Sequence, residues 1–189
     1  MNQEIINPKY TRVSSILSQW DSYGHIDADV LSRKCQIGTN VHQVIENHCN
    51  DIFCCINPEE EGYFNSFLAW KKFACPAIVE TEKRYYCDEH LITGCVDAII
   101  NFKDSEKLLV VDYKTCAQPN KLTWPLQAHF YHYLAKKNCP DVEFEERVLF
   151  VQLSKDGKLP KVHSFDITPA TWEVCKAAMI TYNWKKKFE

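Results

Sequence analysis

Three consecutive segments in the middle of the chain, rich in Val, Ile and Tyr, constrain the fold more than any other feature. They cover residues 77–87, 91–102 and 108–113, and short polar turns separate them. β-Branched and aromatic residues fit a pleated, half-buried surface, and runs of this length between polar turns are typical of strands. We therefore predict three consecutive antiparallel strands.

Helical patterns flank these strands on both sides. In the longest pattern, apolar residues recur at 3.6-residue spacing, which indicates one buried face. We predict helices at residues 11–20, from near Gly38, at 59–74, from about Thr123 and from Thr168-Pro169, with a turn around Tyr23-Gly24 and a second hairpin at 147–153 and 159–165.

The composition is that of a folded chain. Of 189 residues, 46% are hydrophobic and 25% are charged, which excludes a disordered or fibrous protein, and no apolar run approaches the roughly 20 residues that span a bilayer. We expect one domain over residues 1–189, with a helical part at about 1–75, the central sheet and its helix at about 76–138, and a hairpin and helix at about 142–189. Because residues 1–4 lack the features of signal and transit peptides, we expect a cytoplasmic protein with no membrane partner.

Ten cysteines suggest a metal site at first sight. None of them forms a CxxC pair, which is the usual beginning of a zinc or iron–sulfur site. We expect most of them to be reduced and buried as small apolar residues. A Cys/His zinc protein is an alternative that only the numbers of cysteines and histidines suggest. Because the net charge is −3, local patches rather than the whole chain would have to attract nucleic acid.

Two aspartates fall on neighbouring predicted strands. If residues 91–102 and 108–113 form a hairpin centred on Asp104-Ser105, Asp97 lies directly opposite Asp112. Like charges so close are destabilising unless a positive charge lies between them. Lys114 is two residues beyond Asp112 and therefore shares its face of the sheet. Two carboxylates and an ammonium group converge on one spot.

This group has two interpretations on its residues alone. Hard oxygen ligands with open coordination positions suit Mg²⁺ or Mn²⁺ and a phosphate substrate, with Lys114 stabilising charge on phosphorus. The alternative is a salt-bridge cluster on a solvated face, although the apolar strands around it favour the edge of a core. A register shift of one residue would place Asp97 opposite Tyr113 instead and separate the carboxylates.

Four short motifs together resemble a known family. In chain order they are Gly38-Thr39-Asn40-Val41-His42 at the start of a helix, Gly94-Cys95-Val96-Asp97, Val111-Asp112-Tyr113-Lys114-Thr115, and Gln127 with Tyr131. From about Tyr10 to Tyr133 the chain is similar to the PD-(D/E)XK nuclease superfamily, in its RecB-like exonuclease branch, which includes small phage-type exonucleases. The proline of the family name is replaced by Val96, as is common in that branch.

The resemblance implies an α/β fold with a restriction-endonuclease-like core, a central mixed β-sheet flanked by helices. It also implies roles for single residues. Asp97, Asp112, the carbonyl of Tyr113 and His42 would bind metal, and Lys114 would orient or activate the attacking water. Gln127 and Tyr131, one helical turn apart, would contact the DNA backbone or support Lys114.

The function that follows is a Mg²⁺- or Mn²⁺-dependent DNA exonuclease that hydrolyses phosphodiester bonds with a metal-activated water, in DNA recombination, repair or phage DNA processing. Its substrate would be linear or single-stranded DNA, with a helicase or an annealing protein as a candidate partner. The alternative is a non-catalytic protein on the same scaffold that binds nucleic acid or another partner. Iron–sulfur members of the branch carry three clustered cysteines after the core. Only Cys139 and Cys175 lie beyond Tyr131 here, so we expect no such cluster.

A second copy of the acidic pattern occurs later in the chain. Pro140-Asp141 precedes Asp156-Gly157-Lys158 by the same spacing. We reject this copy because residues 154–157 have turn chemistry, which would place Asp156 and Lys158 on a loop.

Several weaker features remain open. Glu80 or Glu82 would add an acidic ligand, or either is an exposed strand carboxylate. His48 is expected in the core, and His129 and His132 on exposed helix positions.

The chain has only five glycines. Gly38 and Gly94 suggest backbone close to metal or phosphate, whereas the sequence gives no structural reason for a glycine at position 62. Candidate DNA contacts are the basic pairs at 33–34, 71–72, 83–84 and 136–137, the rings of Trp20, Tyr23 and Trp124, and residues 184–188. The alternative for the pairs is a solvated helix face, and for residues 184–188 it is favourable charge at a helix end.

Overall fold

A computed structural model describes residues 7, 9–21 and 26–188. The expected turn at Tyr23-Gly24, the ring of Tyr23 and residues 1–4 lie outside the described residues. Within the described part, no helix is both long enough and apolar enough to cross a membrane.

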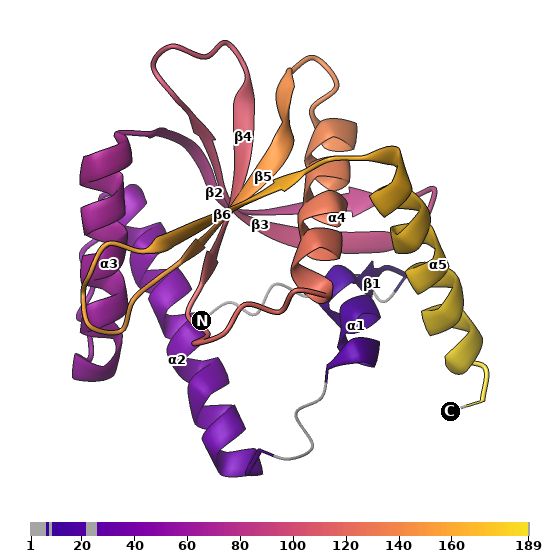
Figure 1. The fold of residues 1–189 in the computed structure, drawn as a ribbon, viewed down its shortest axis with the longest axis horizontal. Coiled ribbons are helices and arrows are strands. Elements are labelled where there is room, and N and C mark those ends of the chain that lie inside the picture. Colours follow the sequence, from indigo (N-terminus) through magenta and orange to yellow (C-terminus); the bar gives the residue numbers. More distant parts are fainter. Residues whose placement is uncertain (1–6, 8, 22–25, 189) are drawn as a thin grey trace.

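Within the described residues, a central mixed sheet of six strands, β1–β6, organises the fold (Figure 1). Strand β3 pairs antiparallel with both β2 and β4, which confirms the three predicted antiparallel strands. Strand β4 pairs parallel with β5, β5 pairs antiparallel with β6, and the short β1 runs parallel to the start of β3. The strands are β1 (Thr11–Arg12), β2 (Ala77–Cys87), β3 (Ile92–Asn101), β4 (Leu108–Lys114), β5 (Phe144–Gln152) and β6 (Lys161–Asp166).

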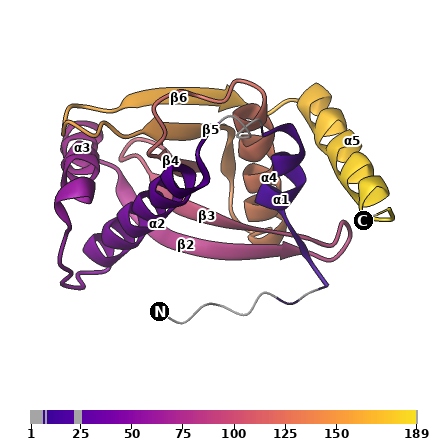
Figure 2. The same ribbon diagram turned by 90° about the horizontal axis from the view of Figure 1, so that it is seen from below.

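Helices cover both faces of this sheet, as expected. In Figure 2, α2 and α3 lie on one side, and α1, α4 and α5 lie on the other. The helices are α1 (Val13–Leu17), the 3₁₀ turn η1 (Ser18–Trp20), α2 (Ala28–Cys49), α3 (Pro58–Ala74), α4 (Thr123–Asn138) and α5 (Pro169–Lys185).

Two hydrophobic cores result, one on each side of the sheet. Val110 belongs to the core beneath α4, with Phe130 and Phe150. Val111, the next residue, belongs to the core beneath α2 and α3, with Phe67. Because successive side chains of a strand point to opposite faces, a strand covered on both faces is apolar at every position. This explains the continuous apolar runs in β3 and β4.

Helix α2 begins well before the predicted start near Gly38. The carboxylate of Asp27 accepts hydrogen bonds from the backbone N–H groups of Asp29 and Val30, which caps the helix and fixes its start at Ala28. Gly38 is therefore an interior residue, and a Cβ atom there would lie 3.1 Å from Oγ1 of Thr115. By contrast, the predicted start of α5 is confirmed, because Oγ1 of Thr168 accepts from the N–H of Thr171.

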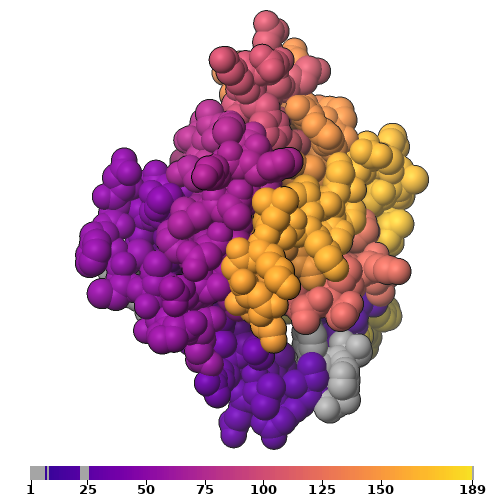
Figure 3. Space-filling model, turned by 60° about the vertical axis from the view of Figure 1, so that its left-hand side comes forward, coloured from indigo at the N-terminus to yellow at the C-terminus, as the bar shows by residue number. Residues whose placement is uncertain are grey.

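Gly62 lets α3 approach the loop between β5 and β6. A Cβ atom at this position would lie 1.7 Å from the carbonyl oxygen of Lys155, closer than atoms can approach. Figure 3 shows the α3 segment against this loop at the surface. The glycine that the sequence left unexplained is required by this contact.

The cysteines are less buried than predicted. All ten are free, but only Cys87 and Cys175 are fully buried, and Cys35, Cys55, Cys75 and Cys116 are exposed. Most of the ten lie on helices, at helix ends or in loops, which the apolar pattern around each residue does not reveal.

Candidate active site

The register of the β3–β4 hairpin brings two aspartates together. The recorded partners are Ala98 with Val111 and Ile99 with Val110, which is the predicted register. Continuing it by one position places Asp97 opposite Asp112. Their exposed fractions are 6% and 2%, so the interpretation as a solvated salt-bridge cluster is wrong. The edge of the core holds two buried carboxylates.

The carboxylate of Asp97 is fixed in two directions. Its Oδ2 accepts a hydrogen bond of 2.7 Å from the backbone N–H of Tyr113, and its Oδ1 lies 3.4 Å from Nδ1 of His42. The first contact crosses from β3 to β4, and the second reaches α2. The sheet and the helix therefore set the orientation of this carboxylate.

His42 lies on the side of α2 that faces the sheet. Its Nε2 donates to the carbonyl oxygen of Tyr113 at 3.0 Å, and its Nδ1 lies 3.3 Å from Oε1 of Glu82. Ligand atoms of His42, Glu82 and Asp97 all lie within 4.8 Å of one another, a spacing suited to one metal ion. Within the described part of the chain, no other such group of three occurs, and this one contains no cysteine.

The structure distinguishes the two glutamates that the sequence left open. Glu80 accepts a hydrogen bond of 2.7 Å from the hydroxyl of Tyr85, whereas Glu82 joins His42 and Asp97. The recorded partners on either side, Thr81 with Ala98 and Lys83 with Val96, place Glu82 across from Asp97.

Backbone irregularities accompany this glutamate. The β2–β3 register shifts between Ile78 and Glu80, and Glu82 has a φ of 47°, a left-handed conformation that is uncommon for a residue with a side chain. Irregularities of this kind re-aim side chains next to functional sites. Because neither is visible in the residue pattern, sequence reasoning could not choose between Glu80 and Glu82.

Burial and charge perturb the ionisable groups of this site. Burial raises the pKa of Asp112 to about 7, the charge of Asp97 acts in the same direction, and Lys114 opposes both. For His42, burial alone would lower the pKa, but Asp97 and Glu82 raise it well above its usual value. The negative charges of the carboxylates therefore stabilise a positive charge placed between them, such as a protonated His42 or a bound cation. Three carboxylates, one imidazole and one carbonyl are a donor set that fits Mg²⁺ or Mn²⁺.

Lys114 is held by a chain of hydrogen bonds from α4. Its Nζ lies 2.7 Å from Oδ2 of Asp112 and donates to Oε1 of Gln127 at 2.8 Å. The Nε2 of Gln127 in turn donates to the hydroxyl of Tyr131 at 3.0 Å. The ammonium also lies 4.7 Å from the centre of the Phe150 ring. Gln127 and Tyr131 thus connect to Asp112 through the lysine.

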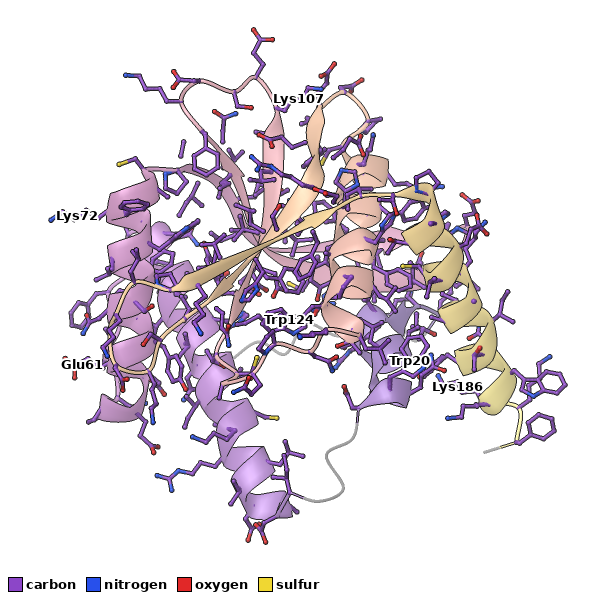
Figure 4. The ribbon with its side chains drawn as sticks, in the orientation of Figure 1. Trp20, Glu61, Lys72, Lys107, Trp124 and Lys186 are labelled. Atoms are coloured by element: carbon purple, nitrogen blue, oxygen red, sulfur yellow. The ribbon has the colours of Figure 1, made fainter. Side chains whose placement is uncertain are left out.

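One open cleft of about 940 Å³ is lined by His42, Asp97, Asp112, Tyr113, Lys114, Gln127 and Tyr131, but not by Glu82. Its lining also includes residues of α1 and, from the segment after β4, residues 115, 116 and 118–122. Trp20 of η1 and Trp124 of α4 complete the lining, and both are labelled in Figure 4. Of the rings proposed from sequence to stack on bases, Trp20 is partly exposed in this cleft, whereas Trp124 is buried in the core and faces Lys114, whose Nζ lies 5.9 Å from the ring centre.

Three other histidines differ in how well they were predicted. His129 and His132 are buried, not exposed, because α4 is covered on both sides: the ring of His129 stacks on Trp172, and that of His132 packs against Phe144. Burial lowers the pKa of His129 to about 4. His48 packs against aromatic rings of α3 as expected, although it is only half-buried.

The sequence of this chain matches one known protein family. The model of the PD-(D/E)XK nuclease superfamily matches residues 58–181. That range contains Glu82, Asp97, Asp112 and Lys114 and begins after His42. No curated protein sequence is significantly similar to this chain.

Several solved structures share the fold. The crystal structure of SSO0001 has a TM-score of 0.53 at 16% identity, over 98% of this chain and 85% of that one. The alkaline exonuclease LHK-Exo from Laribacter hongkongensis has a TM-score of 0.52 at 10% identity, over 94% and 87%. A candidate exonuclease from Eubacterium rectale has a TM-score of 0.53 at 8% identity, over 95% and 82%. At these identities, the likeness extends to the fold.

Proposed function

The chain belongs to the PD-(D/E)XK nuclease superfamily, and on that premise we propose that it is a Mg²⁺- or Mn²⁺-dependent deoxyribonuclease that degrades DNA from its ends. The observation that carries the proposal is the meeting of Glu82, Asp97 and Asp112 on three neighbouring strands, with Lys114 beside them. Buried carboxylates at this spacing are costly unless a cation joins them.

The metal ligands in this proposal are His42, Glu82, Asp97, Asp112 and the carbonyl of Tyr113. A divalent ion held by these groups supplies a Lewis acid that stabilises charge on the phosphate and acidifies water. The contacts of Asp97 with Tyr113 and His42 keep its carboxylate in place before an ion arrives.

Lys114 is the residue that meets the reacting groups. Its ammonium donates hydrogen bonds to the attacking water and to the phosphate oxygens as negative charge increases on them. Gln127 accepts one N–H of that ammonium, and Tyr131 fixes Gln127. We assign both as positioning residues, because they act through Lys114.

Two arguments support cleavage from DNA ends. The neighbour from Laribacter hongkongensis is named an alkaline exonuclease and shares the fold over most of both chains. The cleft is also lined by the partly exposed Trp20, and aromatic rings stack on unpaired bases of a separated strand. Roles in DNA recombination, repair or phage DNA processing, alongside a helicase or an annealing protein, would follow from such an activity.

One digestion experiment tests the proposal. Closed-circular, linear and single-stranded DNA, with separate labels at the 5′ and 3′ ends, are incubated with the protein and Mg²⁺ or Mn²⁺. We expect loss of label from linear or single-stranded DNA, an intact closed circle, and no reaction with chelator or in Asp112→Asn. Cutting of the closed circle would show an endonuclease. DNA binding without hydrolysis under either metal would favour the non-catalytic alternative.

A further inference from the structure

The far end of α5 exposes large apolar side chains to solvent. Trp184 and Phe188 have exposed fractions of 60% and 74%, and their ring centres lie 5.3 Å apart. Ile180, one turn earlier, is also exposed. Large apolar groups on one side of a helix end mark a surface that another molecule covers.

Three consecutive lysines accompany these rings. Lys186 lies with its Nζ 5.0 Å from the centre of the Tyr182 ring, and Lys187 with its Nζ 5.5 Å from the Trp184 ring. Among the described residues, Lys185, Lys186 and Lys187 form no ion pair with a carboxylate. Arg33, Lys136 and Lys137, which belong to other basic pairs, each do. We call Tyr182 and residues 184–188 the α5 strip.

Helix α5, which carries the α5 strip at its far end, contacts an element that lines the cleft. Helix α1 and η1 connect the two: Gln19 donates from Nε2 to the carbonyl oxygen of Ala178 on α5 at 3.1 Å, and its neighbour Trp20 lines the cleft. Trp20 and Tyr182 also pack against the same hydrophobic core. Figure 4 shows the labelled Trp20 and Lys186 on the same side of the molecule, with Lys72 of α3 on the opposite side.

We propose that the α5 strip binds the unpaired DNA strand outside the cleft, an inference that rests on the proposed function. Alternating rings and cations match the two parts of such a strand, because bases stack on aromatic faces and phosphates pair with ammonium groups. Duplex DNA hides its base faces from stacking. The whole chain has a net charge of −3, but Lys185, Lys186 and Lys187, which pair with no carboxylate of the described residues, form a local attraction for a polyanion.

Binding of oligothymidylate to the full chain in chelator tests this without catalysis. Fluorescence anisotropy is recorded for short and long strands over a range of salt concentrations. In Trp184→Ala/Phe188→Ala we expect the long strand to bind about tenfold more weakly. In Lys185→Gln/Lys186→Gln/Lys187→Gln we expect the slope of log affinity against log salt to fall by about 2. In both, the gain in affinity from short to long strands shrinks.

Phe73→Ala and Lys72→Gln on α3 provide matched controls. Phe73 is 78% exposed, much like Phe188, and lies on α3, which contributes no residue to the lining of the cleft. These controls should bind both strands as the wild type does, and circular dichroism should show all variants folded.

Three results decide the inference. Wild-type affinity in both α5 variants overturns it, whether or not the protein is a nuclease. Loss of long-strand binding in the α5 variants supports it even if digestion assays disprove the nuclease proposal. Binding of phosphatidylserine vesicles or polyglutamate that depends on Trp184, with strand binding unchanged, assigns the surface to a membrane or an acidic protein and overturns it.

Discussion

Two segments of this chain carry an aspartate, a second aspartate at the same spacing and a lysine two residues later. In one, Asp97, Asp112 and Lys114 lie on adjacent strands with both carboxylates buried. In the other, Asp141 and Asp156 lie at opposite ends of β5. Nine residues of extended strand separate them by about 30 Å. Proximity depends on the strand path between the acids, not on their spacing in sequence.

The second segment has its own structural explanation. Asp141, Asp156 and Lys158 are exposed, and Gly157 has a φ of 71°, which suits a turn. This segment matches the literal Pro-Asp of the family name better than the first does. It nevertheless lacks burial and convergence, the two properties that make carboxylates hold a cation. Paired substitutions in the two segments can therefore test the assignment.

The largest contrast is expected for the second aspartate of each segment. Asp112→Asn removes a charged ligand and should lower the rate of DNA hydrolysis at least about 10³-fold. Asp156→Asn should leave the rate unchanged, because its carboxylate points into solvent on a loop. Initial rates on linear DNA at saturating Mn²⁺ measure both. Equal rates in the two variants would contradict the assignment.

The lysines should differ nearly as strongly. Lys114→Met keeps the carboxylates but removes the ammonium that faces the phosphate, so kcat should fall about 10²- to 10³-fold. Lys158→Met should have no effect. Single-turnover digestion separates this loss from weaker DNA binding. A variant that lost only affinity would show that Lys114 binds substrate without assisting the reaction.

Metal binding should follow the first aspartates. Calorimetric titration with Mn²⁺ should show at least about tenfold weaker binding in Asp97→Asn, since its carboxylate joins His42 and Glu82 at the metal-binding group. Asp141→Asn should titrate like the wild type. Unchanged Mn²⁺ binding in Asp97→Asn would place the ion elsewhere.

A smaller effect on kcat is expected for Gln127, which contacts Lys114 and not the substrate. Gln127→Leu removes the acceptor of Lys114 and should lower kcat about tenfold, because a displaced ammonium stabilises the phosphate less well. Gln127→Glu keeps an acceptor and should recover much of the rate. A rise in KM alone, with kcat constant, would argue against a positioning role.

The loop of the second segment should matter for the stability of the fold rather than for activity, through its contact with Gly62 of α3. Gly62→Ala forces a methyl group against the carbonyl of Lys155, and relaxation of that contact should cost about 1–3 kcal/mol of unfolding free energy. Urea denaturation measures the loss. Activity per folded molecule should remain that of the wild type, since the contact lies away from the cleft.

Local patterns predicted the parts of the site that depend on neighbouring residues. The β3–β4 register followed from two apolar runs around one polar turn, and it placed Asp97 against Asp112 correctly. Lys114 followed from strand periodicity. These features require only a short stretch of chain, so the sequence contains enough information to define them.

Tertiary packing determined what the patterns missed. Glu82 enters the site through a register shift and a left-handed backbone residue, neither of which has a residue signature. His129 and His132 are buried because α5 and the sheet enclose α4, and a helix read alone shows only one apolar face. The early start of α2 came from the single cap at Asp27.

Gly94 has a role other than the metal or phosphate contact that the sequence suggested. A Cβ atom there would lie 2.9 Å from the ring of Tyr131 and 3.0 Å from Leu134. The hydrogen atom of this glycine therefore sets how closely α4 approaches β3. The same ring ends the chain of contacts through Gln127 to Lys114. A methyl group on β3 would push α4 outward and shift Gln127, the acceptor that holds the ammonium of Lys114. The close packing of α4 on this glycine therefore helps to set the position of that ammonium.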